Sequence, residues 1–410
     1  MAEFRFIHCA DLHLGSRFAG FASRDAMLAE KLAQSPWEAL ERLVDRAVAG
    51  KVDFVTIAGD VFEELSPPLP VWQKFLSFME KLSGAGIEVF ICAGNHDPLE
   101  SAWKYASSLP DKVKLFPAEA LFFPVEKANS VIAYVGGISY QGVSAPADYA
   151  KRIIDAVPAG NVPKFALLHT EVDGSAGSPY APVPLAELCG ADLSGWLLGH
   201  VHSGAILSES PLIIYPGVLQ GRAVDEPGLH YAAEITFDRS GRCRCEFISL
   251  SPYRFESITV DVSGAENISE IIAALKEESR KYINSSDTVN VFRLKLCGTT
   301  ELDKVLRMEN SEELHDMLLP ALEGRAFLEK IIIATGAGRK GELPAEAVEE
   351  IDKALEQLEK AGYCSEVIAQ LKKSCRGIPE FSAEEIAEFY REARERLLDK
   401  LSPENSDDIQ

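Results

Sequence analysis

Short apolar runs alternate with segments of helical periodicity over the first 255 residues, which is the pattern of stacked α and β layers. Five of these runs have the length and composition of buried strands, and each is followed directly by polar residues that can bind a metal. The runs lie at residues 4–10, 53–58, 88–93, 165–168 and 196–198. Because open α/β sheets carry their functional sites at the carboxyl ends of strands, this pattern predicts a site assembled from several strand ends.

A helix is predicted between the first two strands, ending near Gly50. Ser35 is expected to be its N-cap. Pro36 fits the first turn of such a helix, and Glu38 can reach back to the cap.

A second pattern begins near residue 255 and reads strand, helix, strand, helix, strand. Residues 257–262 alternate with period two, Asn267 is expected to cap a helix, and further strands are predicted at 289–296 and 328–334. Residues 336–341 are rich in glycine but lack the spacing of a phosphate-binding loop, so they are interpreted as a linker.

From Pro344 onward the chain is predicted to be helical, and a capping box at Ser382 and Glu385 precedes the last helix. Two apolar stripes mark the helices: Val348, Ile351, Leu355 and Leu358 in one, and Ile386, Phe389, Ala393 and Leu397 in the other. The expected organisation is therefore a large α/β domain at 1–255, a small α/β accessory domain at 256–336, a helical region at 344–402 and a disordered tail at 403–410.

Composition and charge exclude several classes of protein. The chain has 410 residues, and 41 Lys and Arg against 63 Asp and Glu give a net charge of −22, which argues against a basic nucleic-acid-coating protein and a polybasic membrane binder. The N-terminus lacks the pattern of a signal peptide, and no apolar run reaches the roughly 18 residues of a membrane span. Eight cysteines form no CxxC pair. We expect a soluble, cytoplasmic protein without a disulfide framework.

The polar residues at the strand ends have the chemistry of a two-metal site. Two divalent ions about 3.5–4 Å apart need a shared carboxylate, and Asp60 can offer one oxygen to each. The further candidate ligands are Asp11, His13, Asn95, His169, His200 and His202. Five of the eight histidines, at positions 13, 96, 169, 200 and 202, fall at these strand ends. Neutral imidazole suits Mn, Fe, Zn and Ni equally well.

The ordered string DLH (11–13), GD (59–60), GNHD (94–97), His169 and GHVH (199–202) resembles the calcineurin-like metallophosphoesterase superfamily. The resemblance implies a four-layer αββα sandwich with two β-sheets, followed by a small α/β cap domain and a helical C-terminal tail. It also implies the ligand sets, which are Asp11, His13, Asp60 and His202 for one ion and Asp60, Asn95, His169 and His200 for the other. His96 would lie over the scissile phosphate, and Asp97 would fix the tautomer and orientation of His96.

Further motifs look like the SbcD/YhaO branch of DNA-repair exonucleases: CADLHLG (9–15), GDVFE (59–63), LLHTEVDG (167–174) and YPGVLQGR (215–222). The resemblance implies a DNA exonuclease subunit with two metal ions, Mn being expected and Mg, Fe, Zn and Ni the alternatives. It implies a homodimer and a partner that is an SbcC-like coiled-coil ABC-type ATPase. The chain departs from some double-strand-break nucleases of this group, which carry His where this sequence has Glu63.

Two other functions use the same residues. A phosphodiesterase for small or cyclic nucleotides needs the same metals but a closed pocket, and a scaffold for DNA ends or for the ATPase needs little catalysis. Arg222 could clamp a substrate phosphate or be a salt-bridge partner, whereas His8 is expected to be a structural histidine. Because a nuclease usually has a basic footprint, the acidity of the chain favours a partner that supplies DNA affinity, with the helical tail as its docking site.

Overall fold

The computed structural model describes residues 3–16, 18, 26–145, 148–175, 177–283, 288–308, 311–337, 345–374 and 381–400. The predicted tail at 403–410 and most of the predicted linker lie outside these residues. The chain divides into two compact units, and each consists of two stretches of sequence. The first unit is Met1–Glu256 with Ser285–Phe292, and the second is Ser257–Asn284 with Arg293–Gln410.

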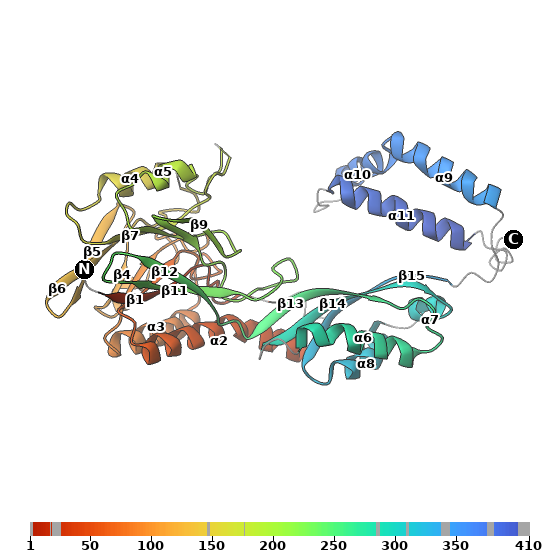
Figure 1. Ribbon diagram of the computed structural model, residues 1–410, viewed down its shortest axis with the longest axis horizontal. Coiled ribbons are helices and arrows are strands. Elements are labelled where there is room, and N and C mark those ends of the chain that lie inside the picture. Colours follow the sequence, from red (N-terminus) through yellow and green to blue (C-terminus); the bar gives the residue numbers. More distant parts are fainter. Residues whose placement is uncertain are drawn as a thin grey trace. The chain divides into compact units, whose positions relative to one another are not determined.

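Two six-stranded sheets form the first unit (Figure 1). The first sheet has the order β12-β11-β1-β2-β3-β4, with β1 to β4 parallel and β11 and β12 antiparallel at one edge. Its strands are β1 (Phe4–Cys9), β2 (Phe54–Ala58), β3 (Glu88–Cys92), β4 (Val113–Leu115), β11 (Tyr231–Phe237) and β12 (Cys243–Ser249).

The second sheet has the order β5-β6-β7-β8-β10-β9, with parallel central strands and an antiparallel strand at each edge. Its strands are β5 (Leu121–Lys127), β6 (Ser130–Gly137), β7 (Lys164–His169), β8 (Gly195–Gly199), β9 (Ala205–Glu209) and β10 (Leu212–Tyr215). The five strands predicted from apolar runs are therefore central or near-central members of the two sheets.

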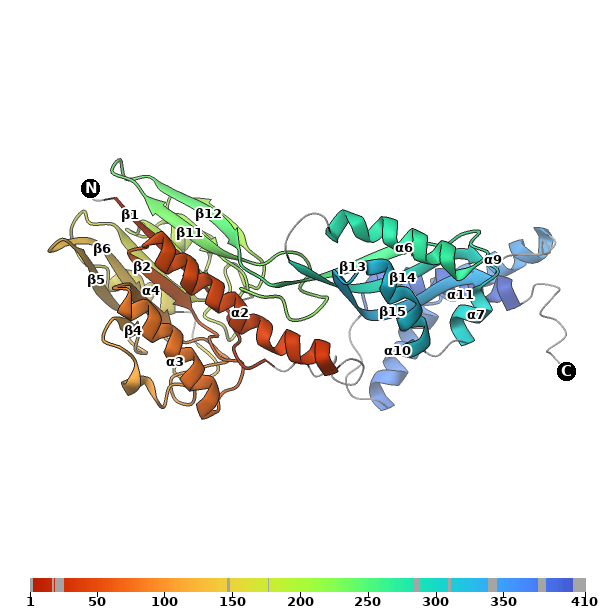
Figure 2. The ribbon, with the colours of Figure 1, turned by 90° about the horizontal axis from the view of Figure 1, so that it is seen from below.

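Three hydrophobic cores separate four layers. The core between the sheets contains Phe6, Phe54 and Phe165, with the rings of Phe6 and Phe54 stacked at 4.4 Å between centroids. The helices α2 (Ala26–Gly50) and α3 (Leu69–Gly84) cover the outer face of the first sheet, where they lie side by side (Figure 2). The short helices α4 (Tyr149–Asp155) and α5 (Leu185–Cys189) cover the outer face of the second. The predicted four-layer αββα sandwich is confirmed.

A buried histidine links the two sheets. His8 on β1 lies 3.1 Å from the carbonyl oxygen of Leu198 on β8, which can only accept, so the imidazole Nε2 donates this hydrogen bond. Its Nδ1 lies 3.0 Å from the hydroxyl of Thr56. Burial lowers the pKa of His8 to about 4, so the ring is neutral. His8 is a structural residue, as the sequence predicted.

The start of α2 corrects the sequence prediction. The helix is already formed at Ala26, so Ser35 and Pro36 lie in its interior and Ser35 is not an N-cap. Pro36 has no N–H for the carbonyl group of Leu32, and the hydroxyl of Ser35 donates to that oxygen at 2.6 Å instead. The serine thereby satisfies the acceptor that the proline leaves unpaired.

Three strands form a further sheet of order β13-β14-β15. They are β13 (Tyr253–Asp261), β14 (Val289–Thr300) and β15 (Ala326–Ala337), and β13 and β14 run across the division between the units. The helices that follow or connect them are α6 (Ile268–Ile283), α7 (Asp303–Met308), α8 (Ser311–Leu318), α9 (Ala345–Lys360), α10 (Tyr363–Ser374) and α11 (Ala383–Lys400). Two 3-10 turns, Ala106–Ser108 and Leu319–Leu322, complete the described elements.

The predicted caps in this half of the chain are present. The Asn267 side chain accepts from the Glu270 backbone N–H at 3.2 Å, and Ser382 and Glu385 form the reciprocal capping box, with distances of 3.2 and 2.7 Å. Among the described helices, none combines the length and apolarity that crossing a membrane demands.

Candidate metal centre

The predicted ligands lie where the strands of both sheets end. Asp11 and His13 follow β1, Asp60 follows β2, and Asn95 follows β3 in the first sheet. In the second sheet His169 is the last residue of β7, and His200 and His202 follow β8. The candidate centre is thus divided between the two sheets, and its geometry depends on how closely the sheets approach.

Several of the predicted ligand residues have an unusual backbone conformation. Asp11, His13, Asp60 and His200 have positive φ angles of 51°, 44°, 49° and 95°. Such angles are unfavourable for residues with a Cβ and concentrate at functional sites. The conformation is held by backbone hydrogen bonds, since Asp11 N–H donates to the Gly59 carbonyl at 3.1 Å and His13 N–H to the Asp60 carbonyl at 2.9 Å.

Two glycines allow the strand ends to approach closely. A Cβ at Gly199 would lie 1.8 Å from the carbonyl oxygen of Ala58, at the point where β8 meets β2. A Cβ at Gly94 would lie 2.2 Å from the Oδ1 atom of Asp60. No side chain fits in either space, so these two positions require glycine.

The potential ligand atoms form three overlapping groups, each within 4.8 Å: Asp11, His13 and His202; His13, Asp60 and His96; and Asp11, Asp60 and His169. The Nε2 atoms of His13 and His202 are 3.3 Å apart. On the other side, His169 Nε2 lies 3.5 Å from an oxygen of Asp60 and 2.9 Å from the side-chain oxygen of Asn95. Asp60 therefore lies between the two sets, as a bridging carboxylate must.

His200 and His96 lie at the margin of this cluster. The His200 ring packs 5.2 Å from that of His169, between centroids, and its backbone N–H donates to both oxygens of Asp11 at 3.1 Å. The ring nitrogens of His200 belong to none of the three groups. His96 contributes a ring nitrogen to the group of His13 and Asp60, and its backbone N–H donates to Asp60 at 2.9 Å.

The electrostatics of the cluster favour a cation. Burial and the neighbouring Asp60 raise the pKa of Asp11 well above its usual value. Burial opposes the ionisation of Asp60, but attraction to the surrounding His169, His13 and His96, which acts where these rings are protonated, and the hydrogen bond from the His96 N–H lower the pKa of this carboxyl below its usual value. Burial lowers the pKa of both His13 and His169, which keeps these imidazoles neutral. Two adjacent buried carboxylates with neutral imidazoles fit divalent metal ions, whose charge compensates for the burial.

Asp97 does not occupy the place that the sequence analysis expected. Its buried carboxylate accepts three backbone N–H groups, from Gly94 at 2.7 Å, Asp60 at 3.1 Å and Val61 at 2.9 Å. The ring nitrogen Nδ1 of His96 lies instead 3.4 Å from the carbonyl oxygen of Glu63. Asp97 therefore holds together the two turns that carry Asp60 and Asn95, and its carboxylate is committed to these backbone groups rather than to the His96 ring.

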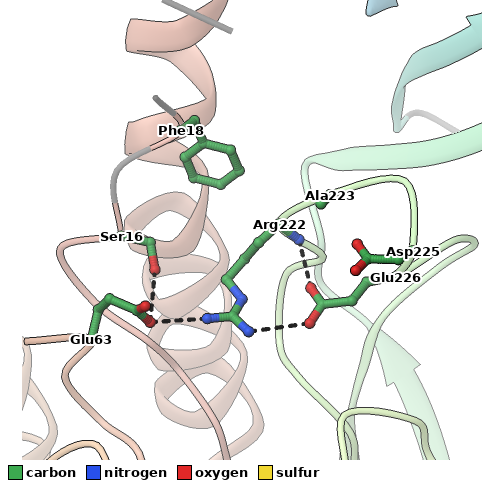
Figure 3. Close-up of a pocket in the computed structure, with 7 residues that line it drawn as sticks. All are labelled: Ser16, Phe18, Glu63, Arg222, Ala223, Asp225 and Glu226. Carbon is green, nitrogen blue, oxygen red and sulfur yellow. Dashed lines mark hydrogen bonds and ion pairs between the residues drawn. The ribbon is translucent and has the colours of Figure 1, made fainter. Parts of the chain in front are cut away.

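A second layer of charged residues surrounds two of the histidines. Glu63 lies 2.8 Å from His13 Nδ1, and Glu226 lies 2.6 Å from His202 Nδ1. The hydrogen bond with His13 lowers the pKa of Glu63 to about 2. Arg222 forms ion pairs with both carboxylates, so the structure shows the salt-bridge role for this residue (Figure 3). Glu226 was missed in the sequence, where nothing in its spacing from the ligands marks it.

These charged residues line a cavity of about 260 Å³ beside the cluster. Its lining consists of Ser16, Phe18, Glu63, Arg222, Ala223, Asp225 and Glu226. Three carboxylates and one guanidinium face this cavity, so its lining is acidic.

Comparison with known proteins adds the family context. Residues 4–204 match the model of the calcineurin-like phosphoesterases, and residues 255–336 match that of the middle domain of metallophosphoesterase YhaO. The uncharacterized metallophosphoesterase YhaO of Bacillus subtilis is 32% identical over 307 residues, covering 73% of each chain. The DNA double-strand break repair protein Mre11 of Thermoplasma acidophilum is 23% identical over 54% of this chain and 57% of its own. One component of the nuclease SbcCD of Escherichia coli is 36% identical over 23% of this chain and 21% of its own.

Proposed function

Since this chain belongs to the calcineurin-like metallophosphoesterases, and within them to the YhaO-like family, we propose that it is a nuclease subunit that hydrolyses DNA phosphodiester bonds with two metal ions. One observation carries the proposal: ligand residues from both sheets converge, with Asp60 between the two sets. The similarity to Mre11 and to the component of nuclease SbcCD supports DNA as the substrate.

The residues of the cluster have separate tasks in this proposal. Asp11, His13, Asp60 and His202 would hold one ion, and Asp60, Asn95, His169 and His200 the other, with Mn expected and Mg, Fe, Zn and Ni as alternatives. Two bound cations supply positive charge to the phosphate oxygens and lower the pKa of water toward about 7. Because the donors are oxygens and neutral imidazoles, the chain offers ligands that suit each of these metals.

His96 is proposed to donate to the leaving oxygen, or to a non-bridging oxygen of the phosphate, in the transition state. Its backbone is fixed by the hydrogen bond to Asp60, and its Nδ1 faces the Glu63 carbonyl oxygen. The Nε2 atom is therefore the ring nitrogen available to the substrate. Arg222 as a substrate clamp stays a prediction, but its guanidinium is already engaged by two carboxylates.

The test compares the wild type with His96→Ala and Asp60→Asn, after removal of metals and reloading with single metals. Turnover is measured on end-labelled linear duplex and single-stranded DNA and on a chromogenic phosphodiester. We expect His96→Ala to retain metal and to lose most turnover, whereas Asp60→Asn should lose metal as well. Equal metal content and equal activity in all three proteins would refute the assignment.

The choice of substrate separates the alternatives. Degradation of DNA supports a nuclease, and activity confined to small diesters supports a small-nucleotide or cyclic-nucleotide phosphodiesterase. Loaded wild-type protein that cleaves neither would support a scaffold for DNA ends or for the ATPase, although the buried donor set has no evident role in a scaffold.

We also propose partners for the chain. With a net charge of −22, DNA affinity is best supplied by a second protein, for which an SbcC-like coiled-coil ABC-type ATPase is the candidate. The helices α9 and α11 keep Leu358, Phe389 and Leu397 about 40% exposed, which makes this region the proposed docking site. Co-purification that survives deletion of residues 344–410 would disprove this role. The homodimer and the cytoplasmic location stay predictions, the first testable by sedimentation.

A further inference from the structure

We infer that Arg222 is a positioning residue: by bridging Glu63 and Glu226, it fixes the tautomer and orientation of two of the metal-binding histidines, His13 and His202. The inference rests on the metal centre proposed above. It concerns the side of the centre formed by these two histidines and not the side formed by His169.

Arg222 lies between the carboxylates of Glu63 and Glu226 (Figure 3), and each of these carboxylates contacts one histidine. Its Nη1 lies 2.9 Å from Glu63 Oε2, and its Nη2 lies 3.2 Å from Glu226 Oε1. Its own backbone N–H donates to the other oxygen of Glu226 at 2.8 Å. Glu63 and Glu226 are 159 and 4 residues from Arg222 in the sequence, so the arginine connects the turn after β2 with the loop that follows β10.

Each carboxylate of this network also contacts a histidine. Glu63 lies 2.8 Å from Nδ1 of His13, and Glu226 lies 2.6 Å from Nδ1 of His202. An ionised carboxylate can only accept hydrogen bonds, so a ring nitrogen this close to one carries the hydrogen. The contact of His202 has hydrogen-bond geometry, whereas that of His13 is equally close but not aligned as a hydrogen bond. In a neutral ring the other nitrogen then has a free lone pair, which is the form that binds a metal.

The two free nitrogens meet at one place. His13 Nε2 and His202 Nε2 are 3.3 Å apart. The two rings come from different sheets, because His13 follows strand β1 of the first sheet and His202 follows strand β8 of the second. Without a proton on either atom they cannot form a hydrogen bond with each other. The network therefore presents two lone pairs, together with the carboxylate of Asp11, to the same region.

The permanent charge of the guanidinium makes this arrangement stable. Glu63 and Glu226 would otherwise be two like charges flanking the same pair of rings, and both are partly shielded from water, with 31% and 14% of their side chains exposed. An ion pair at this depth is screened less than one on the surface. Removing the arginine leaves both carboxylates without their shared cation and releases the rings to rotate.

His169 provides an internal comparison. Its Nδ1 lies 3.0 Å from the carbonyl oxygen of Ala58, so a backbone acceptor fixes the same tautomer on the other side of the centre. This contact does not involve Arg222. Loss of the arginine should therefore affect one metal site and spare the other, whereas a general loss of structure would affect both.

The experiment uses the full chain as wild type, Arg222→Met and Arg222→Lys. Arg46→Met serves as the matched control, because Arg46 forms a two-contact ion pair with Glu234 at 3.0 and 2.8 Å in the same unit. Metal-free protein is titrated with Mn²⁺ and binding is followed by calorimetry and by the electron paramagnetic resonance of the free ion. Thermal melting monitors folding.

We expect two Mn²⁺ ions for the wild type and for Arg46→Met. In Arg222→Met one site should weaken 10- to 100-fold, which is the usual effect of losing an outer partner of a metal-binding histidine, and the second should keep its affinity. Arg222→Lys should lie between the two, since lysine restores the charge but not the fork geometry.

A second readout needs neither metal nor activity. With ¹⁵N-labelled histidine, the metal-free protein has only eight imidazoles to resolve. The resonances of His13 and His202 are assigned by substituting each histidine in turn, and in the wild type they should have the shifts of Nδ1–H tautomers. Arg222→Met should change the shifts of these two rings and leave those of His169 unchanged.

The outcomes separate the two proposals. Unchanged Mn²⁺ affinities and tautomers in Arg222→Met, with an increase in KM alone, would overturn the inference in favour of a direct substrate clamp. Equal weakening of both sites would also overturn it. A wild type that binds fewer than two ions would contradict the proposed metal centre, while the tautomer spectra would still decide the role of Arg222.

Discussion

A single methyl group at Gly199 is expected to separate the two halves of the metal centre. The new Cβ would lie 1.8 Å from the Ala58 carbonyl oxygen, whereas an ordinary contact begins at 3.4 Å, so the backbones must move apart by about 1.6 Å. The two nearest atoms are the backbone oxygen and carbon of Ala58, which no side-chain rotation can move. Pairing holds both strands in place, β8 beside β7 and β2 beside β3. Overpacking of this kind costs about 1–3 kcal/mol, and we expect the upper end for Gly199→Ala.

The effect on activity should exceed the effect on stability. The proposed ligands Asp11 and Asp60 follow strands of one sheet and His169 ends a strand of the other, so the displacement acts directly on the distances between them. A misplacement of about 1 Å in a catalytic site can cost about 100-fold in rate. Gly199→Ala should therefore lose at least that factor in phosphodiester hydrolysis, together with weaker binding of Mn²⁺.

Urea unfolding, Mn²⁺ titration and hydrolysis of a chromogenic diester measure the three quantities. Gly84→Ala is the control, because Gly84 is the last residue of α3 and a Cβ there meets nothing within 4 Å. We expect this variant to be neutral or stabilised by up to about 1 kcal/mol. If Gly199→Ala bound two ions and unfolded at the wild-type urea concentration, the close approach of β2 and β8 could not be what positions the ligands.

Three further predictions follow from the buried polar groups. In Asp97→Asn, an amide N–H₂ replaces one carboxylate oxygen and faces backbone N–H groups, so the free energy of unfolding should fall by about 1–3 kcal/mol in urea melts. A loss of turnover without a loss of stability would instead support the role first expected of Asp97, that of orienting His96. The pKa of His8 is about 4 in the folded state and 6.5 in the unfolded state, so between these pH values the unfolded state binds more protons. The free energy of unfolding should therefore fall by up to about 3 kcal/mol as the pH drops from 6.5 to 4. His8→Gln should flatten this part of the stability profile in metal-free protein, and an identical profile would contradict the assignment. Chelation should lower the melting temperature of the wild type, and Mn²⁺ at 100 times its Kd should restore about 2.7 kcal/mol for each ion bound, whereas Asp60→Asn should not respond to either treatment.

The strands that precede the proposed ligands could be predicted because a strand buried on both faces appears in the sequence as a nearly continuous apolar run. β1, β2, β3, β7 and β8 are apolar along nearly their whole length, and their carboxyl ends face the same edge. Convergence of the ligands then follows from parallel pairing. β5 could not be predicted in this way, because it is half exposed, contains Pro124 and has an irregular register with β6.

The remaining misses have local causes. A serine followed by proline is typical of a helix start, but in α2 the Ser35 hydroxyl replaces the hydrogen bond that Pro36 cannot make, and the helix continues. Asp97 is adjacent to His96 in the sequence, and only the geometry of the turn shows that its carboxylate points to backbone N–H groups. Glu226 reaches His202 from 24 residues later along the chain, and no periodicity marks such a contact.

The first unit is not one continuous stretch of sequence, and this affects its synthesis. Thr288 and Val289 bind the backbone of Ser251 and Pro252, and Val291 and Phe292 are fully buried. When residue 256 has left the ribosome, all the proposed ligand residues are available for folding, but Thr288 and Val289, which bind the backbone of Ser251 and Pro252, are not. A fragment that ends at residue 256 therefore lacks these partners of Ser251 and Pro252, and its unpaired backbone groups would favour association with other chains.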